Sequence, residues 1–368
     1  MPHLLLEGKA DLYEHFLSST ANANLVAITD DFHFQIQTLE RPTLLLRHVR
    51  THGQATNHGE LSDAFYALML SHRQGGYSSR TPLNNGSPIP NTPTLHWHLS
   101  SRSCINHHRD SKVTYLRLES AALLRSFAAQ AIAVCELERL QGVAAPASLV
   151  HWIERLDQQL VGAEPQQHAA ITEVFLNGLA QELRQLLGPP KTSDANAANH
   201  VMMAIESMLV RLNAPISLQE LADALGLTPR TVQACFKKQL NISPMRWLKL
   251  ARLSQLRQQL WDPALARRSL PQVMAECGLS DTSLNRRSYR EVYGISPGEQ
   301  QRQRRAMTGC GQSVIHDSLH RVFDGPNAAI EYLQDLMNSQ GAIGTYRVAV
   351  TVTPTVQAAV QPIDQHCA

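Results

Sequence analysis

A short helical segment near residue 235 carries the side chains with the clearest chemical potential in this chain. Val232, Phe236 and Leu240 recur at helical spacing and should face a core. The residues expected to face outward are Arg230, Thr231, Gln233, Ala234 and Lys237. Arginine can pair with guanine and glutamine with adenine through two hydrogen bonds, and threonine or alanine can pack on a thymine methyl group. This exposed face therefore suits base contacts in the major groove of DNA, with Lys237 and Lys238 on phosphates.

The residues before this helix predict how it is held. Ser217 and Glu220 have the spacing of a capping box at the start of a preceding helix. Gly226 permits a sharp turn, Thr228 can cap the second helix, and Pro229 can take its first position. The segment is therefore predicted to be a helix-turn-helix unit.

The same pattern occurs a second time. Gly226-Leu227-Thr228 returns as Gly278-Leu279-Ser280, 52 positions later, and Ile242-Ser243-Pro244 returns as Ile295-Ser296-Pro297, 53 positions later. In the second unit we expect Ser280 or Asp281 to cap the helix. The residues expected to pack are Leu284, Tyr289, Val292 and Tyr293. The candidates for base contact are Thr282, Ser283, Arg286 and Arg287, with Arg290 on a phosphate.

One long helix, from Pro244 to about Trp261, should join the two units. Arg246 on this helix is a further candidate for a phosphate contact. To enter successive major grooves, the two outward-facing helices would have to lie about 34 Å apart. The charge distribution agrees, because residues 199–305 hold 16 Lys/Arg and 8 Asp/Glu (+8) while the remainder holds 17 and 23 (−6).

The first half of the chain has a different pattern. Residues 25–118 contain short apolar or alternating runs between Gly- and Pro-rich turns, which predicts a β-rich, cupin-like sandwich or barrel. Helical periodicity follows over residues 119–188, with apolar stripes at 123–137 and 171–187. We therefore expect an α+β chain with a regulatory or dimerisation domain at 1–188. A polar linker at 189–199, an all-α domain at 200–305 and a partly disordered extension at 306–368 should follow.

The composition argues for a cytoplasmic protein. The six cysteines are scattered without a C-x-x-C pair, which is typical of reduced thiols. No run approaches 18 apolar residues, and the N-terminus lacks the pattern of a secretory signal.

On these motifs the chain resembles the AraC/XylS family of bacterial transcription regulators over roughly residues 199–305. The residues that carry the resemblance in the first unit are Leu221-Ala222, Gly226 to Arg230, Val232, Phe236, Ile242-Ser243-Pro244, Arg252-Leu253 and Arg257. Those in the second unit are Gly278, Ser280-Asp281, Ser283, Arg287, Tyr289, Tyr293-Gly294 and Ile295-Ser296-Pro297. The resemblance implies a seven-helix domain that binds double-stranded DNA, contact with RNA polymerase, most often as an activator, and an N-terminal sensing or dimerising domain.

Three positions depart from the family pattern. Leu279 and Asn285 stand where the family usually has phenylalanine, and Gln300 replaces a usual aromatic residue. We expect these departures to weaken the core of the second unit, which would then hold mainly the DNA backbone.

Seventeen histidines leave a rival interpretation open. His96 and His98 alternate on a probable strand, and His48, His52, His58, His72, His107 and His108 lie nearby. A cupin-like barrel could gather such residues around a metal, but no ligand motif is complete, so we expect hydrogen-bonded or surface histidines and no metal site.

Three functions are therefore considered. The first is a regulator whose N-terminal domain senses a small molecule, and the second is a constitutive DNA binder whose N-terminal domain only forms a homodimer through one of its apolar stripes. The third is a metal-dependent cupin-type enzyme fused to a degenerate helix-turn-helix unit. The sequence contains no nucleophile triad, P-loop or dinucleotide fingerprint, so we expect no enzyme activity, no catalytic residues and no cofactor.

Overall fold

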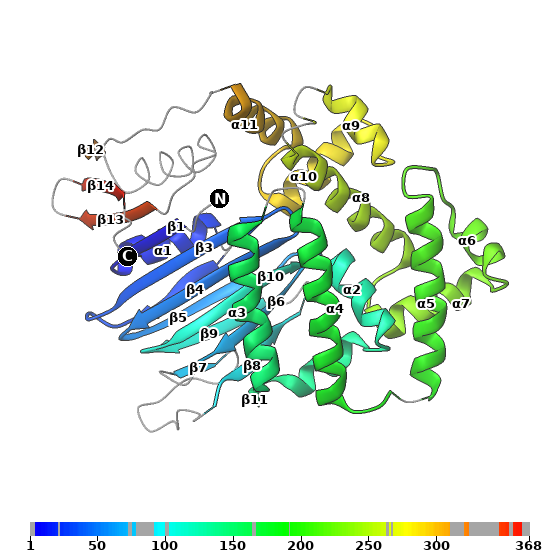
Figure 1. Ribbon diagram of the computed structural model, residues 1–368, viewed down its shortest axis with the longest axis horizontal. Coiled ribbons are helices and arrows are strands. Elements are labelled where there is room, and N and C mark those ends of the chain that lie inside the picture. The colour runs from blue at the N-terminus through cyan, green and yellow to red at the C-terminus, as the bar shows by residue number, and fades with distance from the viewer. Residues whose placement is uncertain are drawn as a thin grey trace.

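The architecture was obtained as a computed structural model, shown in Figure 1. The residues it describes are 4–20, 23–72, 76–78, 92–99, 103–163, 167–190, 192–262, 265, 268–309, 320–323, 346–352 and 356–362.

The N-terminal region forms two sheets, as the alternating runs predicted. One sheet has the order β11-β8-β6-β10-β4-β3-β1-β13-β14-β12, and the other has the order β2-β5-β9-β7. The first strands are β1 (Leu4–Gly8), β2 (Ala23–Ile28), β3 (His33–Arg41), β4 (Leu44–His52), β5 (Gln54–Glu60) and β6 (Phe65–Ser71). They are followed by β7 (Gly76–Ser78), β8 (Thr94–His98), β9 (Ser103–Arg109), β10 (Lys112–Glu119) and β11 (Val143–Ala144). The β region thus begins at Leu4, well before residue 25.

Side chains between the sheets and α1 (Ala10–Thr20) form a separate small core. Tyr13 of α1 packs against Phe32 and Phe34, with ring centroids 5.0 Å away in both cases. In β5 every second residue is buried, which is the period of a strand with one face toward a core. The two-layer arrangement is therefore a sandwich closed on one side by α1.

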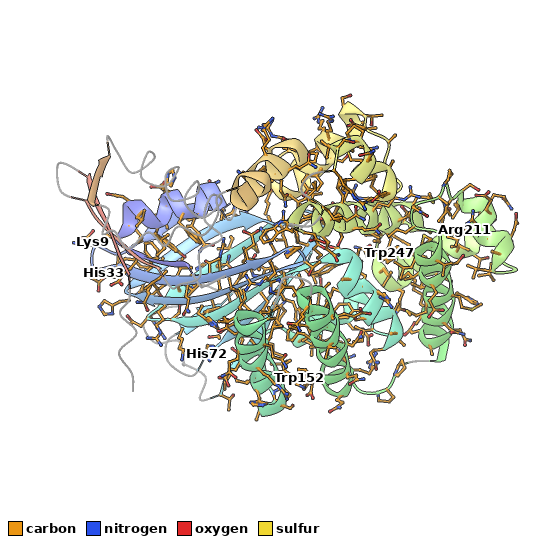
Figure 2. All side chains as sticks on the ribbon, turned by 45° about the horizontal axis from the view of Figure 1, so that its top comes forward. Lys9, His33, His72, Trp152, Arg211 and Trp247 are labelled. Atoms are coloured by element: carbon orange, nitrogen blue, oxygen red, sulfur yellow. The ribbon has the colours of Figure 1, made fainter. Side chains whose placement is uncertain are left out.

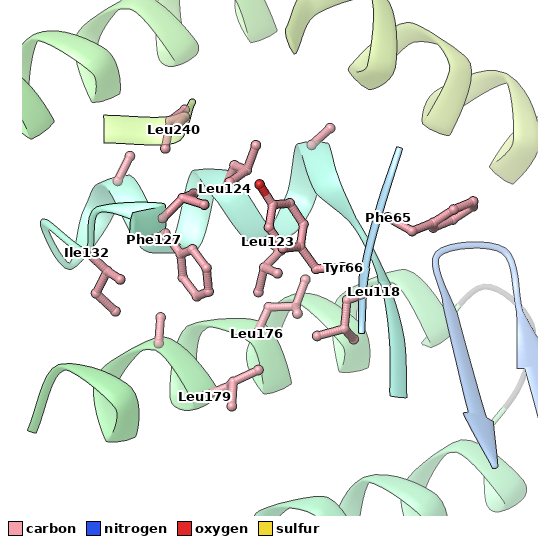
Figure 3. Packing of buried hydrophobic residues seen from close by; sticks show 14 of the residues in the cluster. Phe65, Tyr66, Leu118, Leu123, Leu124, Phe127, Ile132, Leu176, Leu179 and Leu240 are labelled. Carbon is pink, nitrogen blue, oxygen red and sulfur yellow. The ribbon is translucent and has the colours of Figure 1, made fainter. Parts of the chain in front are cut away.

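Three helices and a 3₁₀ segment follow the sheets. They are α2 (Ser120–Ala129), η1 (Val134–Leu140), α3 (Ala147–Gly162) and α4 (His168–Leu187). Leu123, Leu124 and Phe127 of α2 are fully buried between the sheet, α4 and the C-terminal helices, as Figure 3 shows. The stripe at 123–137 is therefore occupied inside one chain. Most of the stripe at 171–187 is also core, because Phe175, Leu179 and Leu183 are buried, whereas Val174 of the same stripe is 60% exposed.

The expected linker at 189–199 is wrong for most of its length. Residues from Thr192 onward are the first turns of α5 (Thr192–Val210). Ala197 and Ala198 are buried in them, and the Asp194 carboxylate lies 2.8 Å from the Lys238 ammonium. A stretch of small residues carries little hydrophobic periodicity, but alanine is the best helix former, and packing against α7 (Pro229–Leu240) completes the helix.

The C-terminal domain contains the two predicted units. The first consists of α6 (Leu218–Ala224) and α7, and the second of α9 (Leu270–Glu276) and α10 (Ser283–Tyr293). The joining helix α8 has the predicted bounds, Pro244–Trp261, and α11 (Pro297–Gly309) ends the domain. The first unit shares one continuous core with the N-terminal helices, whereas the second is built on a smaller core with α8.

The described parts of the extension after residue 305 are one helix end and three strands. Helix α11 continues to Gly309, and the strands β12 (His320–Phe323), β13 (Tyr346–Val352) and β14 (Val356–Pro362) join the larger sheet. Strand β13 pairs in parallel with β1. The remaining residues of 306–368 lie outside the described part. Within the described residues, no single helix is long and apolar enough to span a bilayer.

Candidate nucleic-acid interface

The outward face of α7 is set by strong local signals at both ends. The Thr228 hydroxyl accepts a hydrogen bond from the Thr231 amide at 3.1 Å, and Pro229 occupies the first turn. At the other end Asn241 adopts the left-handed conformation (φ 59°), and its amide donates to the Lys237 carbonyl at 3.1 Å. Before the turn, the capping box of Ser217 and Glu220 is present, with both hydrogen bonds made. These caps fix where α7 begins and ends.

The core residues of α7 point as predicted. Val232, Phe236 and Leu240 are buried, so the opposite face is presented to solvent. Its exposed residues are Arg230, Gln233, Ala234, Lys237 and Lys238, and Thr231 is half-buried. Arg230 and Gln233 have no polar contact to any described residue, so both side chains can meet a ligand without breaking an existing bond. Lys238 differs, because it pairs with Asp194.

The start of α10 corrects two assignments. The cap is neither Ser280 nor Asp281 but Thr282, whose hydroxyl accepts from the Asn285 amide at 3.3 Å. Asp281 instead binds Arg286 through two hydrogen bonds of 2.6 and 2.7 Å, and this contact lowers the pKa of its carboxyl group. Leu284, expected to pack, is 70% exposed. A helix that begins at Ser283 turns Leu284 to the solvent side with Arg287, because neighbours three and four apart share a face.

The remaining predicted residues of α10 are exposed. Ser283, Arg286, Arg287 and Arg290 all lie on the solvent side, and Arg287 forms an ion pair with Glu291 at 2.8 Å. Exposed ion pairs of this kind contribute at most about 1 kcal/mol, so they can be exchanged for phosphate contacts. Tyr289, Val292 and Tyr293 pack inward as expected.

The basic residues of α8 are committed to the protein itself. Arg246, expected on a phosphate, forms a double hydrogen bond with Asp63, with Nε 2.6 Å from Oδ2. Arg252 donates to the carbonyls of Leu212 and Ala214 at 2.8 and 2.6 Å, which caps the end of α5. The phosphate assignment of Arg246 does not hold in this conformation, because its guanidinium group is bound to Asp63. The sequence gives no sign that the N-terminal domain places a carboxylate beside Arg246.

A second set of contacts joins the two domains near the middle of α8. The buried Arg257 donates to the Pro42 carbonyl and to Glu40, both at 2.8 Å. Buried Glu119 accepts from the hydroxyls of Ser254 and Tyr293, the latter at 2.8 Å, and burial raises the pKa of its carboxyl group. Trp247 lies in the same region, between α8 and the helices below it (Figure 2). The sequence pattern missed these acids, because partners more than 100 residues away leave no local signal.

The three departures from the family pattern are accommodated. Leu279 is buried in the core of the second unit. Asn285 donates to the Ser280 carbonyl at 2.7 Å and accepts from Lys249, which fastens the turn before α10. Buried Gln300 accepts from the Tyr289 hydroxyl at 2.5 Å. At Asn285 and Gln300 the second unit therefore has hydrogen bonds in place of aromatic packing.

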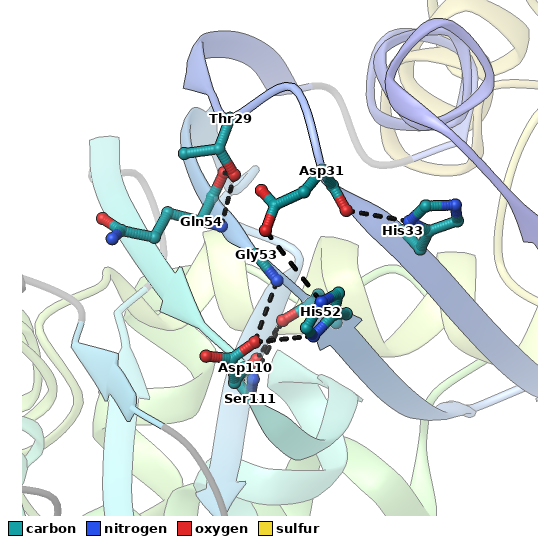
Figure 4. A network of polar contacts seen from close by, with 9 residues as sticks. Thr29, Asp31, His33, His52, Gly53, Gln54, Asp110 and Ser111 are labelled. Atoms are coloured by element: carbon teal, nitrogen blue, oxygen red, sulfur yellow. Dashed lines mark hydrogen bonds and ion pairs between the residues drawn. The ribbon is translucent and has the colours of Figure 1, made fainter.

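Most of the histidines considered as metal ligands form ordinary hydrogen bonds. Among the described residues, no group of three His, Cys, Asp or Glu side chains has the geometry to hold a metal ion. Figure 4 shows the exposed network in which His52 lies 2.9 Å from Asp110 and His33 contacts the Asp31 carbonyl at 2.8 Å.

Five further histidines also form hydrogen bonds. His48 and His72 contact Thr114, and His107 contacts Thr56. His96 and His98 are both buried, and both contact Tyr77, as expected of alternating residues that face one side of a strand. His96 contacts Thr94 at 3.1 Å, His98 contacts Tyr77 at 3.3 Å, and burial lowers the pKa of His96 to about 4.

Comparison with known proteins agrees with the geometry of the C-terminal domain. Residues 221–303 match the family described as "Helix-turn-helix domain". The HTH-type transcriptional regulator GbdR of Pseudomonas aeruginosa is 30% identical over 148 residues, which is 40% of this chain and 38% of GbdR. The XylDLEGF operon transcriptional activator 1 of Pseudomonas putida is 25% identical over 140 residues, 37% of this chain and 41% of that protein. The matched region thus spans less than half of the length of these relatives.

Two solved structures of transcription regulators are among those similar in fold to this chain. One is the AraC-like transcriptional activator CuxR (11% identity, 63% of this chain and 88% of that chain, TM-score 0.37). Another is a transcriptional regulator with an AraC-type DNA-binding domain from Chromobacterium violaceum (28% identity, 30% and 96%, TM-score 0.27). With the two capped units and the buried positions, residues 221–303 form a helix-turn-helix domain that is similar in sequence to the matching parts of these transcriptional regulators.

Proposed function

We propose that this protein is a sequence-specific transcriptional regulator that binds double-stranded DNA through residues 200–305. The observation that carries the proposal is the face of α7, where Arg230 and Gln233 are exposed on a capped helix without polar partners among the described residues. An arginine and a glutamine in such a position can each form two hydrogen bonds to a purine. The relatives GbdR and the XylDLEGF operon activator carry regulator names, which supports the same assignment.

In this proposal α10 enters the next major groove, about 34 Å from α7 along the duplex. Ser283, Arg286 and Arg287 would face the bases, with Arg290 and Lys237 on phosphates. The N-terminal domain serves as the regulatory part, and the DNA-bound protein acts on RNA polymerase as an activator in the cytoplasm. No enzymatic step is assigned to it.

The test compares variants of the full chain on cognate and unrelated DNA after the bound sites have been mapped across a genome. Arg230→Ala and Gln233→Ala should each reduce the preference for the cognate site by about 1–3 kcal/mol, because each removes one pair of base contacts. Lys237→Ala should weaken binding to all sequences alike and reduce the salt dependence.

The matched control is Arg155→Ala, which removes an equally exposed arginine from α3. If gel shifts give Arg230→Ala and Gln233→Ala the same specificity ratio as Arg155→Ala, the base-contact roles are refuted. If the wild-type chain prefers no DNA sequence, the proposed function itself fails.

A further inference from the structure

The sandwich contains a cavity of about 100 Å³ between the two sheets and α1. Its walls are mainly apolar and aromatic side chains, including Phe16, Leu17, Ile36, Val49, Val113 and Tyr115. The volume is well below the roughly 300 Å³ at which pockets for drug-sized ligands begin. The cavity therefore suits a small ligand with an apolar body.

One wall residue does not fit an apolar cavity. Arg47 of β4 lines it, is only 8% exposed, and its buried Nε atom has no hydrogen-bond partner. Within the described residues, its guanidinium group makes no hydrogen bond or ion pair. Burial lowers the pKa of Arg47 to about 10, so the group is still charged at neutral pH. A buried charge without a counter-charge is unfavourable, which means that the protein maintains this group at a cost.

The surrounding groups do not neutralise the charge. The guanidinium carbon lies 4.7 Å from the ring centre of Phe16 and 5.9 Å from that of Tyr115, and these rings attract a cation but accept none of its N–H groups in a hydrogen bond. The acid whose charge acts on it, Glu40, lies 2.8 Å from Arg257 and 3.5 Å from Arg117. Glu60 stands exposed at the rim, where water and salt screen it.

The other polar groups of the cavity satisfy one another. Asn106 donates to Asn57 at 2.9 Å, Asn57 donates to the Tyr13 hydroxyl at 3.3 Å, and Tyr77 donates to Asn106 at 2.5 Å. His108 contacts Ser111 at 2.8 Å, and burial holds its pKa at about 4, so it is neutral. Arg41 shows the contrast, because this arginine is also buried but donates to the carbonyls of Glu40 and Leu160 and so has a structural role.

We propose that this cavity binds a small apolar monocarboxylate, whose carboxylate group pairs with Arg47. A guanidinium group offers two parallel N–H donors that match a carboxylate, and one cation matches one negative charge. The apolar walls would receive the hydrocarbon part. The inference deepens the proposed function, on which it rests, by giving the regulatory domain a ligand class.

The experiment titrates the full chain with the monocarboxylates from butanoate to octanoate, by calorimetry and by thermal shift. Hexanoate should bind at least about tenfold more tightly than hexanamide, which has the same shape without the charge, because a charged hydrogen bond is stronger than a neutral one. Arg47→Met should remove this preference, whereas Arg47→Lys should keep part of it. Without ligand, Arg47→Met should melt no lower than the wild type, because the lost charge has no partner.

Equal affinity for hexanoate and hexanamide in the wild type would overturn the proposal, and so would the absence of binding across the series or full binding by Arg47→Met. The comparison of hexanoate with hexanamide uses only the wild-type protein. It therefore remains a valid test of the proposal even if the Arg47 variants fail to fold. DNA binding by the ligand-free wild type is measured separately. Carboxylate binding without DNA binding would refute only the proposed function. DNA binding without carboxylate binding would refute only the proposed ligand class.

Discussion

The two glycines of the repeated turns are equivalent in backbone conformation but not in surroundings. Gly226 and Gly278 have φ angles of 65° and 69°, which disfavour any residue with a Cβ atom. A Cβ atom at Gly226 would meet nothing within 4 Å. At Gly278 it would lie 2.5 Å from the Leu212 carbonyl oxygen and 2.9 Å from Arg252 Nε. The second turn therefore requires glycine for two reasons: the positive φ angle, and the lack of room for a Cβ atom.

Gly226→Ala should cost about 1–2 kcal/mol of unfolding free energy, which is the cost of the left-handed conformation. Gly278→Ala should cost at least about 1 kcal/mol more, because overpacking against backbone is added and Arg252 loses its place on Leu212. Urea denaturation of the two variants measures which of them loses more unfolding free energy. Equal midpoints would show that the turn at Gly278 can shift without strain.

At the scale of elements, the caps decide which side chains are available to DNA. Thr228 and Thr282 are the N-terminal caps of α7 and α10, and each hydroxyl accepts from the amide three residues later, in Thr231 and Asn285. Thr282 was expected to contact bases, but its hydroxyl accepts a hydrogen bond from the Asn285 amide in the first turn of α10. Of the residues of α10 predicted to contact DNA, Ser283 and the arginines after it remain on the outward face.

Thr282→Ala should therefore lower the unfolding free energy by about 1 kcal/mol, because the Asn285 amide loses its acceptor. Thr282→Ser keeps the hydroxyl and should retain the stability. Urea denaturation gives the stability, and gel shifts give the ratio of cognate to unrelated DNA binding. A variant with wild-type stability and a reduced ratio would restore the base-contact role and reject the cap.

Across the whole molecule, α8 is both the joining helix of the C-terminal domain and its attachment to the N-terminal domain. Arg246 binds Asp63, Arg257 binds Glu40, and Ser254 donates to Glu119. Strand β3 carries Glu40 and also Ile36 of the Arg47 cavity, so the cavity and the domain contact share one strand. The domains are thus connected through rigid elements, which is the arrangement a regulated protein needs.

Asp63→Asn should release Arg246 for a phosphate contact. The slope of log affinity for DNA against log salt should then become steeper by about 0.9, which corresponds to one additional phosphate. Binding should also tighten at low salt. Glu14→Gln is the matched control, because it removes an exposed acid from α1. If both variants change the slope equally, general charge explains the effect and the specific release of Arg246 is refuted.

How much the sequence could predict depended on the range of the interactions. The capping box at Ser217, the turn at Gly226, the cap at Thr228 and the bounds of α8 were predicted because they depend on residues within a few positions of each other. The exposure of Leu284 and the helical state of residues 192–199 were not, because a shifted helix start and a distant packing surface decided them.

The sequence by itself determined the tandem units, their buried and outward faces, and the β-rich region before them, since helix and strand periodicity and turn chemistry are local properties. The tertiary structure alone decided that Arg246 and Arg257 face acids of the other domain and that Arg47 stays buried without one. Electrostatic pairing acts through space between residues far apart in the chain, so only the folded coordinates bring these groups together or leave one alone.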